Sequence, residues 1–420
     1  MKVCVIGNGG REHALAWRLS ISPSVTKVYA IPGSAAMSDC AELVGIDWQQ
    51  SDHLIRFLKD NHVDLVVVGP EAPLVAGLAD ALNAAGIPVF GPSKMAAQLE
   101  GSKVFAKDLM KKYNIPTAAY GVFHKVDEAK KFIAQTGAPI VVKADGLAAG
   151  KGVVVAMTVE EADAAVEDML SGNRFGDAGS TVVIEEFMEG EEASLLAFVD
   201  GKTVVPMIAS QDHKRIFDGD KGPNTGGMGT YAPAPVLTDT LRDEAMKTIL
   251  EPMVAAMQKE GMPYVGCLYA GLMITPQGPK VVEFNARFGD PETQVVLPLL
   301  DSDLGQIMMA CATGTLTADM VKWKDSSAAC VILASKGYPE TSSKGDVIHG
   351  DIKQHDTTIV FHSGTKLVGD EYVTNGGRVL GVVGLGKDLR TALDRAYGRI
   401  EHIDFEGMQY RTDIGAKAFK

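Results

Sequence analysis

The sequence has few cysteines, no excess of basic residues and no long apolar run. Its five cysteines are scattered along the chain and none stands at CxxC spacing from another, which argues against a disulfide framework and favours a reduced, cytoplasmic protein. The net charge of −13 argues against nucleic acid or an anionic membrane as the main partner. A phosphorylated substrate remains possible, because it needs only a local basic site.

Membrane insertion and secretion are also disfavoured. No apolar run reaches the length of a membrane span. The opening MKVCVIGNGG is expected to be a strand that runs into a glycine turn, and we do not expect it to be a signal peptide. With 420 residues, of which 46% are apolar, the chain is expected to fold into two to four globular domains.

The first hundred residues alternate short apolar runs with helical patterns. The runs are at 3–7, 27–31, 63–69 and 87–91. Nearly continuous apolar strands that alternate with helices predict a parallel sheet covered on both faces. Ligands collect at the carboxyl ends of such strands. The loops expected at that edge are GNGGREH (7–13), PGSAA (32–36) and GPEAPL (69–74).

Three further segments follow. Residues 117–190 predict a small α+β lid, after a helix over 103–113. Strands are expected to dominate from 193 to 298, interrupted by a polar, glycine-rich loop at 211–230 and a helix near 239–259. Residues 325–420 predict another αβ unit. We therefore divide the chain into 1–102, 103–324 and 325–420.

The run VVKADGLAAGKGV (141–153) is the most informative stretch. Lys143 ends an apolar strand, and Gly146, Gly150 and Gly152 follow in a loop of small residues that can approach phosphate oxygens closely. The run is not a P-loop, because Gly152 stands where that motif has Ser or Thr. An ordinary hairpin is the alternative, but the composition favours a flap over phosphates.

The first glycine turn invites a dinucleotide interpretation that the residues do not support. Gly7 and Gly9 fit G-x-G-x-x-G, but Glu12 replaces the third glycine and no acid ends the second strand. A dehydrogenase is therefore disfavoured. The turn at Gly9 and Gly10 still offers N–H groups to a phosphate, and a purely structural turn is the alternative.

Two acidic or polar segments are candidates for ligand contact. In IEEFMEGEEAS (184–194), backbone groups near Glu186–Met188 could bind adenine and Glu192 could accept from ribose hydroxyls; a solvated acidic face is the alternative. QDHKRIFDGDKGPNTGGMGTYAPAP (211–235) is long for a structureless loop, which favours function. Its His213 has no His or Cys partner at zinc-ligand spacing.

The segment KVVEFNARFGDPETQ (280–294) carries the best oxygen ligands. In an extended strand Glu283, Asn285 and Arg287 share one face. A carboxylate and an amide oxygen suit Mg²⁺ between phosphates, and the guanidinium suits developing negative charge. A solvated edge with a Glu–Arg pair is the alternative.

Together these motifs resemble the ATP-grasp superfamily, and within it the glycinamide ribonucleotide synthetase family. The resemblance spans the chain. It rests on these motifs in this order: GNGGREHALAW, VGPEAPL, FGPS, QLEGSKVFAKD, KADGLAAGKGV, IEEFMEGEEAS, SQDHKR, GPNTGGMG, YAGLMI, EFNARFGDPETQ, GDVIHG and TNGGRV. It implies an α/β fold with a parallel-sheet pre-ATP-grasp N-domain, an ATP-grasp core with a small α+β lid, and an αβ C-terminal domain.

The resemblance also implies a reaction and its site. ATP would phosphorylate glycine, and the amine of 5-phosphoribosylamine would displace phosphate from the glycyl phosphate. The implied ATP-binding residues are Lys103, Lys143, Gly146, Gly150, Gly152, Glu185, Glu186, Phe187, Met188 and Glu192. Glu283 and Asn285 would hold Mg²⁺ or Mn²⁺, with Arg287 and Lys143 as catalytic cations. Substrate contacts are expected at Gly9, Gly10, Glu71, Asp212, Lys214, Asn224, Thr225, Gly226 and Asp290.

One departure and several alternatives remain at this stage. Many ATP-grasp enzymes carry a Glu on the strand before Glu283, where Gly271 stands here, so the number of metal ions is open. Another ATP-grasp ligase, a carboxylase acting on bicarbonate, or a nucleotide-binding protein without turnover would also use many of these motifs. We expect only small-molecule substrates as partners, with no nucleic acid or membrane, and a monomeric protein.

Overall fold

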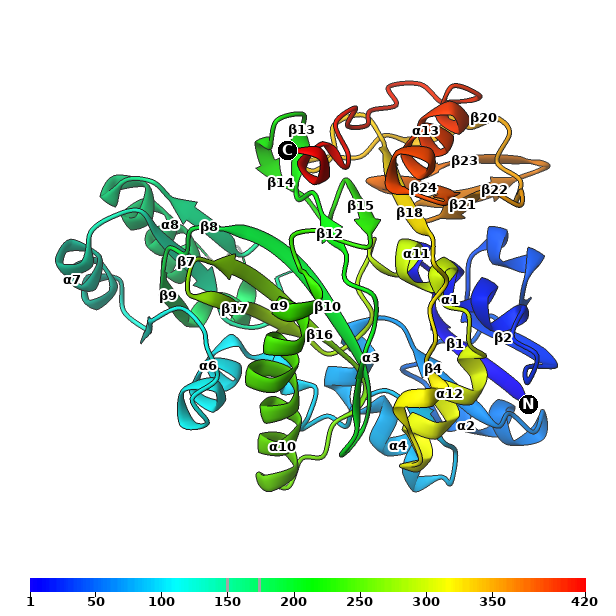
Figure 1. Ribbon diagram of the computed structural model, residues 1–420, viewed down its shortest axis with the longest axis horizontal. Coiled ribbons are helices and arrows are strands. Elements are labelled where there is room, and N and C mark those ends of the chain that lie inside the picture. Colours follow the sequence, from blue (N-terminus) through cyan, green and yellow to red (C-terminus); the bar gives the residue numbers. More distant parts are fainter. Residues whose placement is uncertain (149–150, 173–174) are drawn as a thin grey trace.

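The computed structural model describes residues 1–148, 151–172 and 175–420. The chain forms an N-terminal unit, a lid, a central antiparallel sheet and a C-terminal unit (Figure 1). In Figure 1 the lid projects to the left, and the N- and C-terminal units lie one above the other on the right. The central sheet therefore connects the lid with the rest of the molecule.

The N-terminal unit contains the predicted parallel sheet, in the strand order β3-β2-β1-β4-β5. Its strands are β1 (Lys2–Gly7), β2 (Lys27–Pro32), β3 (Glu42–Leu43), β4 (Leu65–Val68) and β5 (Val89–Phe90). The helical elements are α1 (Gly10–Ser20), η1 (Ala35–Asp39), α2 (Ser51–Asp60), α3 (Glu71–Ala76) and α4 (Leu78–Ala84). Every residue of β4 is buried, which explains its unbroken apolar sequence.

Two helices, α5 (Gln98–Gly101) and α6 (Lys103–Lys112), lead to the lid. The Ser102 hydroxyl caps α6 by accepting a hydrogen bond from the Phe105 N–H at 3.1 Å. Asp145, from the lid loop, adds a second cap: its Oδ1 accepts from the Lys103 N–H at 2.6 Å. The lid loop is thus attached to the first turn of α6.

The lid is a four-stranded antiparallel sheet, β6-β9-β7-β8, with a small apolar core of its own under two helices. Its elements are β6 (Tyr120–Phe123), α7 (Val126–Thr136), β7 (Ile140–Ala144), β8 (Val153–Ala156), α8 (Val159–Ser171), η2 (Gly176–Ser180) and β9 (Val182–Glu186). The element order matches the sequence prediction. Lys143 is placed where β7 enters the glycine loop.

The central sheet has the antiparallel order β11-β10-β16-β17. Its strands are β10 (Glu191–Asp200), β11 (Val204–Pro206), β16 (Val265–Thr275) and β17 (Gly278–Asn285). The predicted helix near 239–259 is α9 (Asp239–Ala245), a π-helical turn (Met246–Leu250) and α10 (Glu251–Lys259). These helices and the N-terminal sheet share one apolar core with the central sheet.

The predicted loop at 211–230 is more structured than its composition suggested. It forms β12 (Gln211–Asp212), β13 (Arg215–Phe217), β14 (Lys221–Asn224) and β15 (Gly229–Ala232). β13 and β14 form a hairpin, whereas β12 and β15 join the C-terminal sheet. The glycine and polar residues of this segment did not predict strands, and β15 pairs with β18, about a hundred residues away.

The C-terminal unit is built on the antiparallel sheet β12-β15-β18-β24-β21, against which α13 packs. Its main elements are β18 (Ser327–Ala334), β21 (Thr358–His362), β24 (Arg378–Gly386) and α13 (Leu389–Ile400). Smaller pairings involve β19 (Lys344–Val347), β20 (His349–Gly350), β22 (Thr365–Val368), β23 (Glu371–Asn375) and β25 (Ile403–Asp404). The remaining helical elements are α11 (Thr293–Val296), η4 (Leu297–Leu299), α12 (Leu304–Thr313), η5 (Ala318–Met320) and η6 (Ala416–Phe419).

The five cysteines are all free. Within the described parts of the chain, no helix is both long enough and apolar enough to cross a membrane.

Candidate active site

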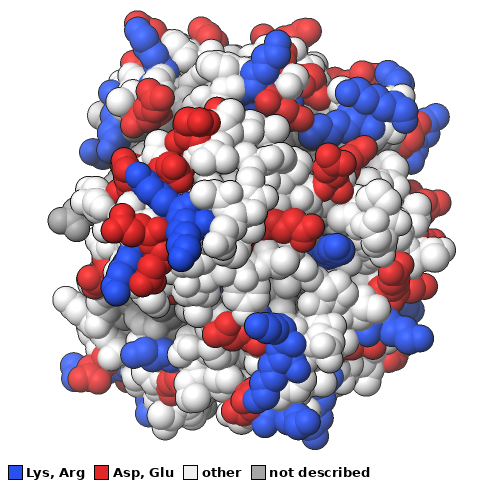
Figure 2. All heavy atoms as spheres, turned by 90° about the vertical axis from the view of Figure 1, so that its left-hand side faces the viewer, with Lys and Arg blue, Asp and Glu red and all other residues white. Residues whose placement is uncertain are grey.

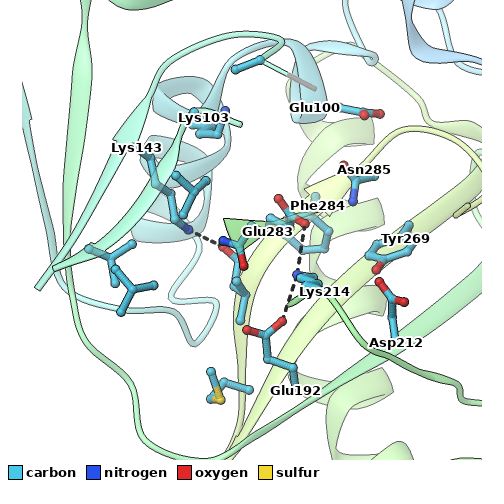
Figure 3. Close-up of a pocket in the computed structure, with 18 of the residues that line it drawn as sticks. Glu100, Lys103, Lys143, Glu192, Asp212, Lys214, Tyr269, Glu283, Phe284 and Asn285 are labelled. Atoms are coloured by element: carbon cyan, nitrogen blue, oxygen red, sulfur yellow. Dashed lines mark hydrogen bonds and ion pairs between the residues drawn. The ribbon is translucent and has the colours of Figure 1, made fainter. Parts of the chain in front are cut away.

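A cavity of about 930 Å³ lies where the lid, the central sheet and both terminal units meet. Its wall includes Gly146 and Gly152 from the lid loop, and Glu283 and Asn285 from the end of β17. Arg287 also lines it, from just after the strand, whereas the sequence had suggested a place on the strand itself. Residues 146–148 and 152 of the lid loop and residues 283–285 and 287 therefore line one cavity. Figure 3 shows Lys103, Lys143 and Glu283 around it.

The lid loop is attached to α6 by a second contact, made by a lysine. The Lys103 ammonium donates to the Gly146 carbonyl at 2.8 Å. Burial lowers the pKa of Lys103, and the Lys143 ammonium adds to this effect, while nearby carboxylates, first that of Glu283, oppose it. The positive φ of Gly146, 84°, suits glycine at this turn.

Lys143 is buried beside a carboxylate. Its ammonium lies 3.0 Å from Glu185 Oε2 and donates to the Val282 carbonyl at 3.1 Å. A second ammonium, that of Lys107, lies 3.3 Å from the same Glu185 oxygen. Two cations thus share one carboxylate on the lid side of the cavity, and the group has a net charge of +1.

Glu283 and Glu192 face each other through Lys214. The Lys214 ammonium lies 2.9 Å from Glu192 Oε2 and 4.0 Å from Glu283 Oε1. Dashed lines mark these contacts in Figure 3. Burial would raise the pKa of Glu283, but the ammonium groups of Lys214, Lys143 and Lys103 hold it below its usual value. Glu283 is therefore ionised, as an oxygen ligand for a cation must be.

Glu283 and Asn285 are two residues apart on β17, and both line the cavity. One carboxylate and one amide oxygen on the same face of a strand fit a hard divalent cation that also binds phosphate oxygens. Gly271 pairs with Glu283 in the β16–β17 register, as the sequence suggested. β16 therefore supplies no side-chain ligand opposite Glu283.

Arg287 is held between two carboxylates. Its Nη2 lies 2.9 Å from Glu100 Oε1, and its Nε lies 3.4 Å from Glu71 Oε2. Burial raises the pKa of Glu100, and the Glu71 charge adds to it, while Arg287 opposes both effects. The pKa of Glu71 is lowered, because Arg287 and Arg11 outweigh the effect of burial. The guanidinium is thus fixed in one orientation at the cavity wall.

The C-terminal unit contributes Arg378. Its Nη1 donates to the Gly226 carbonyl at 2.9 Å and to the Asp290 carbonyl at 3.0 Å. The Gly226 N–H donates to the Tyr338 hydroxyl at 2.9 Å. Both polar groups of the Gly226 backbone are therefore held by residues of the C-terminal unit, next to the predicted substrate residues Asn224 and Thr225.

Acidic groups gather in this part of the cavity. Burial raises the pKa of Asp212 well above its usual value, and the nearby Glu292 charge adds to the effect. Asp290 behaves in the opposite way: Arg378 and Arg11 outweigh burial and lower its pKa. Buried carboxylates of this kind suit a substrate that brings an amine.

Most of the residues expected from the sequence line the cavity. They are Glu71, Lys103, Lys143, Gly146, Gly152, Glu185, Glu186, Phe187, Met188, Glu192, Asp212, Lys214, Asn224, Thr225, Gly226, Glu283, Asn285, Arg287 and Asp290. Gly150 lies outside the described residues.

Gly9 and Gly10 are not among the lining residues. The carboxylate of Glu12 turns back and accepts from the Gly9 N–H at 2.8 Å, so an anion already occupies the N-terminus of α1. A side chain at Gly10 would meet Ser363 of the C-terminal unit at 2.3 Å. Both glycines thus permit close packing, and the substrate contact expected at Gly9 and Gly10 stays a prediction.

Several lining residues were not expected from the sequence. They are Arg11, Glu100, Lys107, Tyr269, Glu292, Arg378 and Lys417. All of these except Lys417 lie inside the motifs quoted above, so the motif letters were a usable signal. Their orientation toward the cavity depends on contacts between units.

Figure 2 views the molecule from the lid side and shows acidic and basic side chains interspersed over that face.

Comparison with protein families supports the family resemblance that the sequence motifs indicated. Three family models match: the phosphoribosylglycinamide synthetase N domain over residues 1–100, the ATP-grasp (A) domain over 101–293 and the C domain over 328–417. Relatives named phosphoribosylamine–glycine ligase include one from Halalkalibacterium halodurans, 53% identical over all of this chain and 97% of that protein. One from Neisseria meningitidis serogroup A is 54% identical over all of this chain and 99% of that protein.

Solved structures agree. A phosphoribosylamine–glycine ligase from Thermotoga maritima is 33% identical and superposes with a TM-score of 0.86, over 99% of this chain and all of that one. The biotin carboxylase domain of the Hydrogenobacter thermophilus 2-oxoglutarate carboxylase gives a TM-score of 0.75 at 17% identity, over 97% of this chain and 91% of that one. The latter likeness is one of fold alone. These findings confirm the predicted fold class and the predicted family.

Proposed function

The chain belongs to the phosphoribosylglycinamide synthetase family, and we propose that the cleft described above carries out the family's ligase reaction. The reaction joins glycine to 5-phospho-D-ribosylamine at the expense of ATP, and gives glycinamide ribonucleotide, ADP and phosphate for purine biosynthesis. One observation supports this use of the cleft above the others: the lid loop and the end of β17 line a single cavity.

ATP is assigned to the space between the lid and the central sheet. Residues 185–188 line the cavity, and we assign the adenine ring to this segment. Glu192 suits the ribose hydroxyls. Lys143 and Lys103 suit the phosphates, because a buried ammonium offsets phosphate charge far better than an exposed one. A cavity of this size is large enough for a nucleotide and a small substrate.

Glu283 and Asn285 would hold Mg²⁺ or Mn²⁺. When bound, the metal would neutralise part of the charge on the terminal phosphates. The donor set fits this task, because both ligands are oxygens and the carboxylate is ionised. Lys214, which now lies between Glu192 and Glu283, is placed to contact phosphate or substrate carboxylate once the two acids find other partners.

The chemistry requires two anions to meet. A glycine carboxylate oxygen attacks the γ-phosphorus of ATP, ADP leaves, and glycyl phosphate forms. The amine of phosphoribosylamine then attacks the acyl carbon and phosphate leaves. The protein supplies cations and positioning for both steps, and no covalent nucleophile is needed. Arg287, fixed by Glu100 and Glu71, would stabilise the charge on the transferring phosphate.

The lid gives the acyl phosphate protection from water. Glycyl phosphate hydrolyses readily, so the reaction gains from a cover of small residues over the phosphates. Gly146 and Gly152 allow a close approach: a side chain at Gly152 would meet Ala148 at 2.6 Å. We further propose that the protein acts in the cytoplasm, since its five cysteines are free, and that it is a monomer.

The test is coupled ADP release. We expect release that requires glycine and freshly prepared phosphoribosylamine together. A related carboxylase would release ADP with bicarbonate in place of both, and a nucleotide-binding protein without turnover would release none. Either of these outcomes would overturn the proposed reaction.

A further inference from the structure

Lys107 is a buried lysine that the reaction as described does not use. It lies on α6 and is only 3% exposed. Its ammonium lies 3.3 Å from Glu185 Oε2 and donates to the Thr117 hydroxyl at 2.7 Å. Thr117 in turn donates to the Val281 carbonyl of β17 at 2.7 Å. Lys107 therefore joins α6, the lid strand β9 and the central sheet.

A buried charge of this kind needs a reason. Removing a charged lysine from water is unfavourable unless partners compensate. Thr117 and Glu185 compensate here, yet Glu185 already has an ammonium partner in Lys143, at 3.0 Å. One lysine is enough to neutralise Glu185, so a purely structural ion pair would not need Lys107 in addition to Lys143. With a polyanion in the cavity, the second lysine has a role.

The charges can be counted with and without Lys107. With it, two ammonium groups and one carboxylate leave a net charge of +1 facing the nucleotide. Without it, Lys143 and Glu185 form a neutral pair. The Lys143 ammonium would then have to break its ion pair with a buried carboxylate before it could contact a phosphate. Both lysines contact the same oxygen, Glu185 Oε2, so they compete for one partner.

We propose that Lys107 is a positioning residue for nucleotide binding. It holds Glu185 and neutralises its charge, so that the Lys143 ammonium is available to the phosphates of ATP. The inference rests on the proposed placement of ATP in this cleft. It assigns no contact between Lys107 and the reacting atoms.

The environment of Lys107 makes its charge depend on pH. Burial lowers its pKa to about 8, against the opposing effect of Glu185 and with a smaller contribution from the Lys143 charge. The Tyr120 ring of β6 also faces it, with its centroid 5.7 Å from the ammonium. Lys107 is therefore charged at neutral pH and loses its proton as the pH rises through about 8.

The experiment is calorimetric binding of ADP, in magnesium buffer, from pH 7 to pH 9. Wild-type affinity should fall across this range, because deprotonated Lys107 leaves Glu185 to Lys143 alone. Lys107→Arg should bind well at pH 7 and keep that affinity at pH 9, because a guanidinium stays protonated. Lys107→Met should bind on the order of tenfold more weakly at pH 7 and show little further change.

Two further variants separate the charge effect from a structural one. Lys111→Met, an exposed lysine on the same helix, should bind like wild type at every pH. The double variant Lys107→Met/Glu185→Gln should recover much of the affinity lost in Lys107→Met, because no carboxylate then retains Lys143. If Lys107 only supported the fold, the second change would bring no recovery.

The outcomes are distinct. Equal alkaline loss in wild type and Lys107→Arg would assign the titration to another group and overturn the proposal, as would wild-type affinity in Lys107→Met. Absence of ADP binding by the wild-type protein would overturn the placement of the nucleotide itself. ADP binding without ligase turnover would contradict the proposed reaction and leave the role of Lys107 intact.

Discussion

Lys214 and Glu283 face each other across the cleft, with Nζ 4.0 Å from Oε1. The same ammonium lies 2.9 Å from Glu192, so one lysine stands between the proposed ribose acid and the proposed metal ligand. The carboxylate of Glu192 is the first cause of the raised pKa of Lys214, which burial opposes. Binding of the ribose by Glu192 and of a metal by Glu283 therefore has to replace these two contacts of Lys214.

Glu283→Ala should abolish metal-dependent ADP release while the protein remains folded. The change removes the only carboxylate of the proposed metal pair, and Gly271 offers no substitute on the neighbouring strand. Turnover against Mg²⁺ and Mn²⁺ concentration measures the effect. Glu251→Ala, an exposed position on α10, serves as the control. Full metal-dependent activity in Glu283→Ala would show that the metal is held elsewhere.

Arg287→Ala should lower kcat far more than it changes ADP affinity, since the guanidinium is proposed to act on the transferring phosphate. The truncation leaves Glu100 and Glu71 without their shared cation, which costs stability. Arg287→Lys keeps the charge without the planar fork, and it should retain the fold with low kcat. A variant in which only nucleotide affinity falls would assign Arg287 to ground-state binding.

Arg378→Ala should raise KM for phosphoribosylamine or glycine and leave ADP binding almost unchanged. The side chain joins the Gly226 and Asp290 carbonyls, so its loss frees the loop at 224–226 at the substrate end of the cleft. Steady-state kinetics and calorimetry together measure the two effects. Lys366→Ala, exposed on the C-terminal unit, is the matched control. A drop in ADP affinity equal to the rise in KM would contradict this separation.

Arg411→Ala should destabilise the protein by about 2 kcal/mol, the size expected for lost hydrogen bonds to charged groups. Arg411 is 1% exposed and pairs with Asp220 and Asp413, which connects the C-terminal segment with the β13–β14 hairpin. Thermal unfolding measures the loss.

The ion pairs of Arg411 with Asp220 and Asp413 also predict that the stability gained from Arg411 decreases in acid. Burial would raise the pKa of Asp220 and of Asp413, but Arg411 and the other partners of each carboxylate lower both below the usual 3.8. Carboxyl groups with a lowered folded-state pKa contribute stability above their unfolded pKa, and that contribution is lost as the pH falls through and below it. The Tm difference between wild type and Arg411→Ala should therefore shrink as the pH falls from 5 to 3. A constant difference would exclude the ion pairs as its cause.

Local patterns were sufficient for the elements of the lid and for four of the five strands of the N-terminal unit, but not for the short strand β3 or for α3, which begins inside the segment 69–74 expected to be a loop. Strand β4 is apolar throughout because both faces of a parallel sheet are covered, and the helices between strands have ordinary amphipathic spacing. The segment 211–230 shows the limit of this approach. Strands β12 and β15 have short polar or glycine-containing sequences, and β15 pairs with β18, about a hundred residues away. No local signal marks such pairing.

Some residues of the candidate site could be identified from local sequence, whereas others depend on the tertiary structure. Lys143, Glu283 and Asn285 could be selected from the sequence because each stands at a strand end with a residue type suited to phosphate or metal. Gly9 and Gly10 also had a suitable local pattern, but Glu12 and the C-terminal unit fill the space beside them.

The sequence by itself determined the family, the order of the units and the chemical groups available for phosphate and metal, because these depend on residue types at short spacing. Only the tertiary structure decided that Lys107 shares Glu185 with Lys143, that Glu100 holds Arg287, and that Arg378 reaches the cleft from the C-terminal unit. Each of these contacts joins residues from 78 to 187 positions apart or from different units. Such contacts arise when sheets and helices pack around shared cores, and residue spacing carries no information about which side chains then meet.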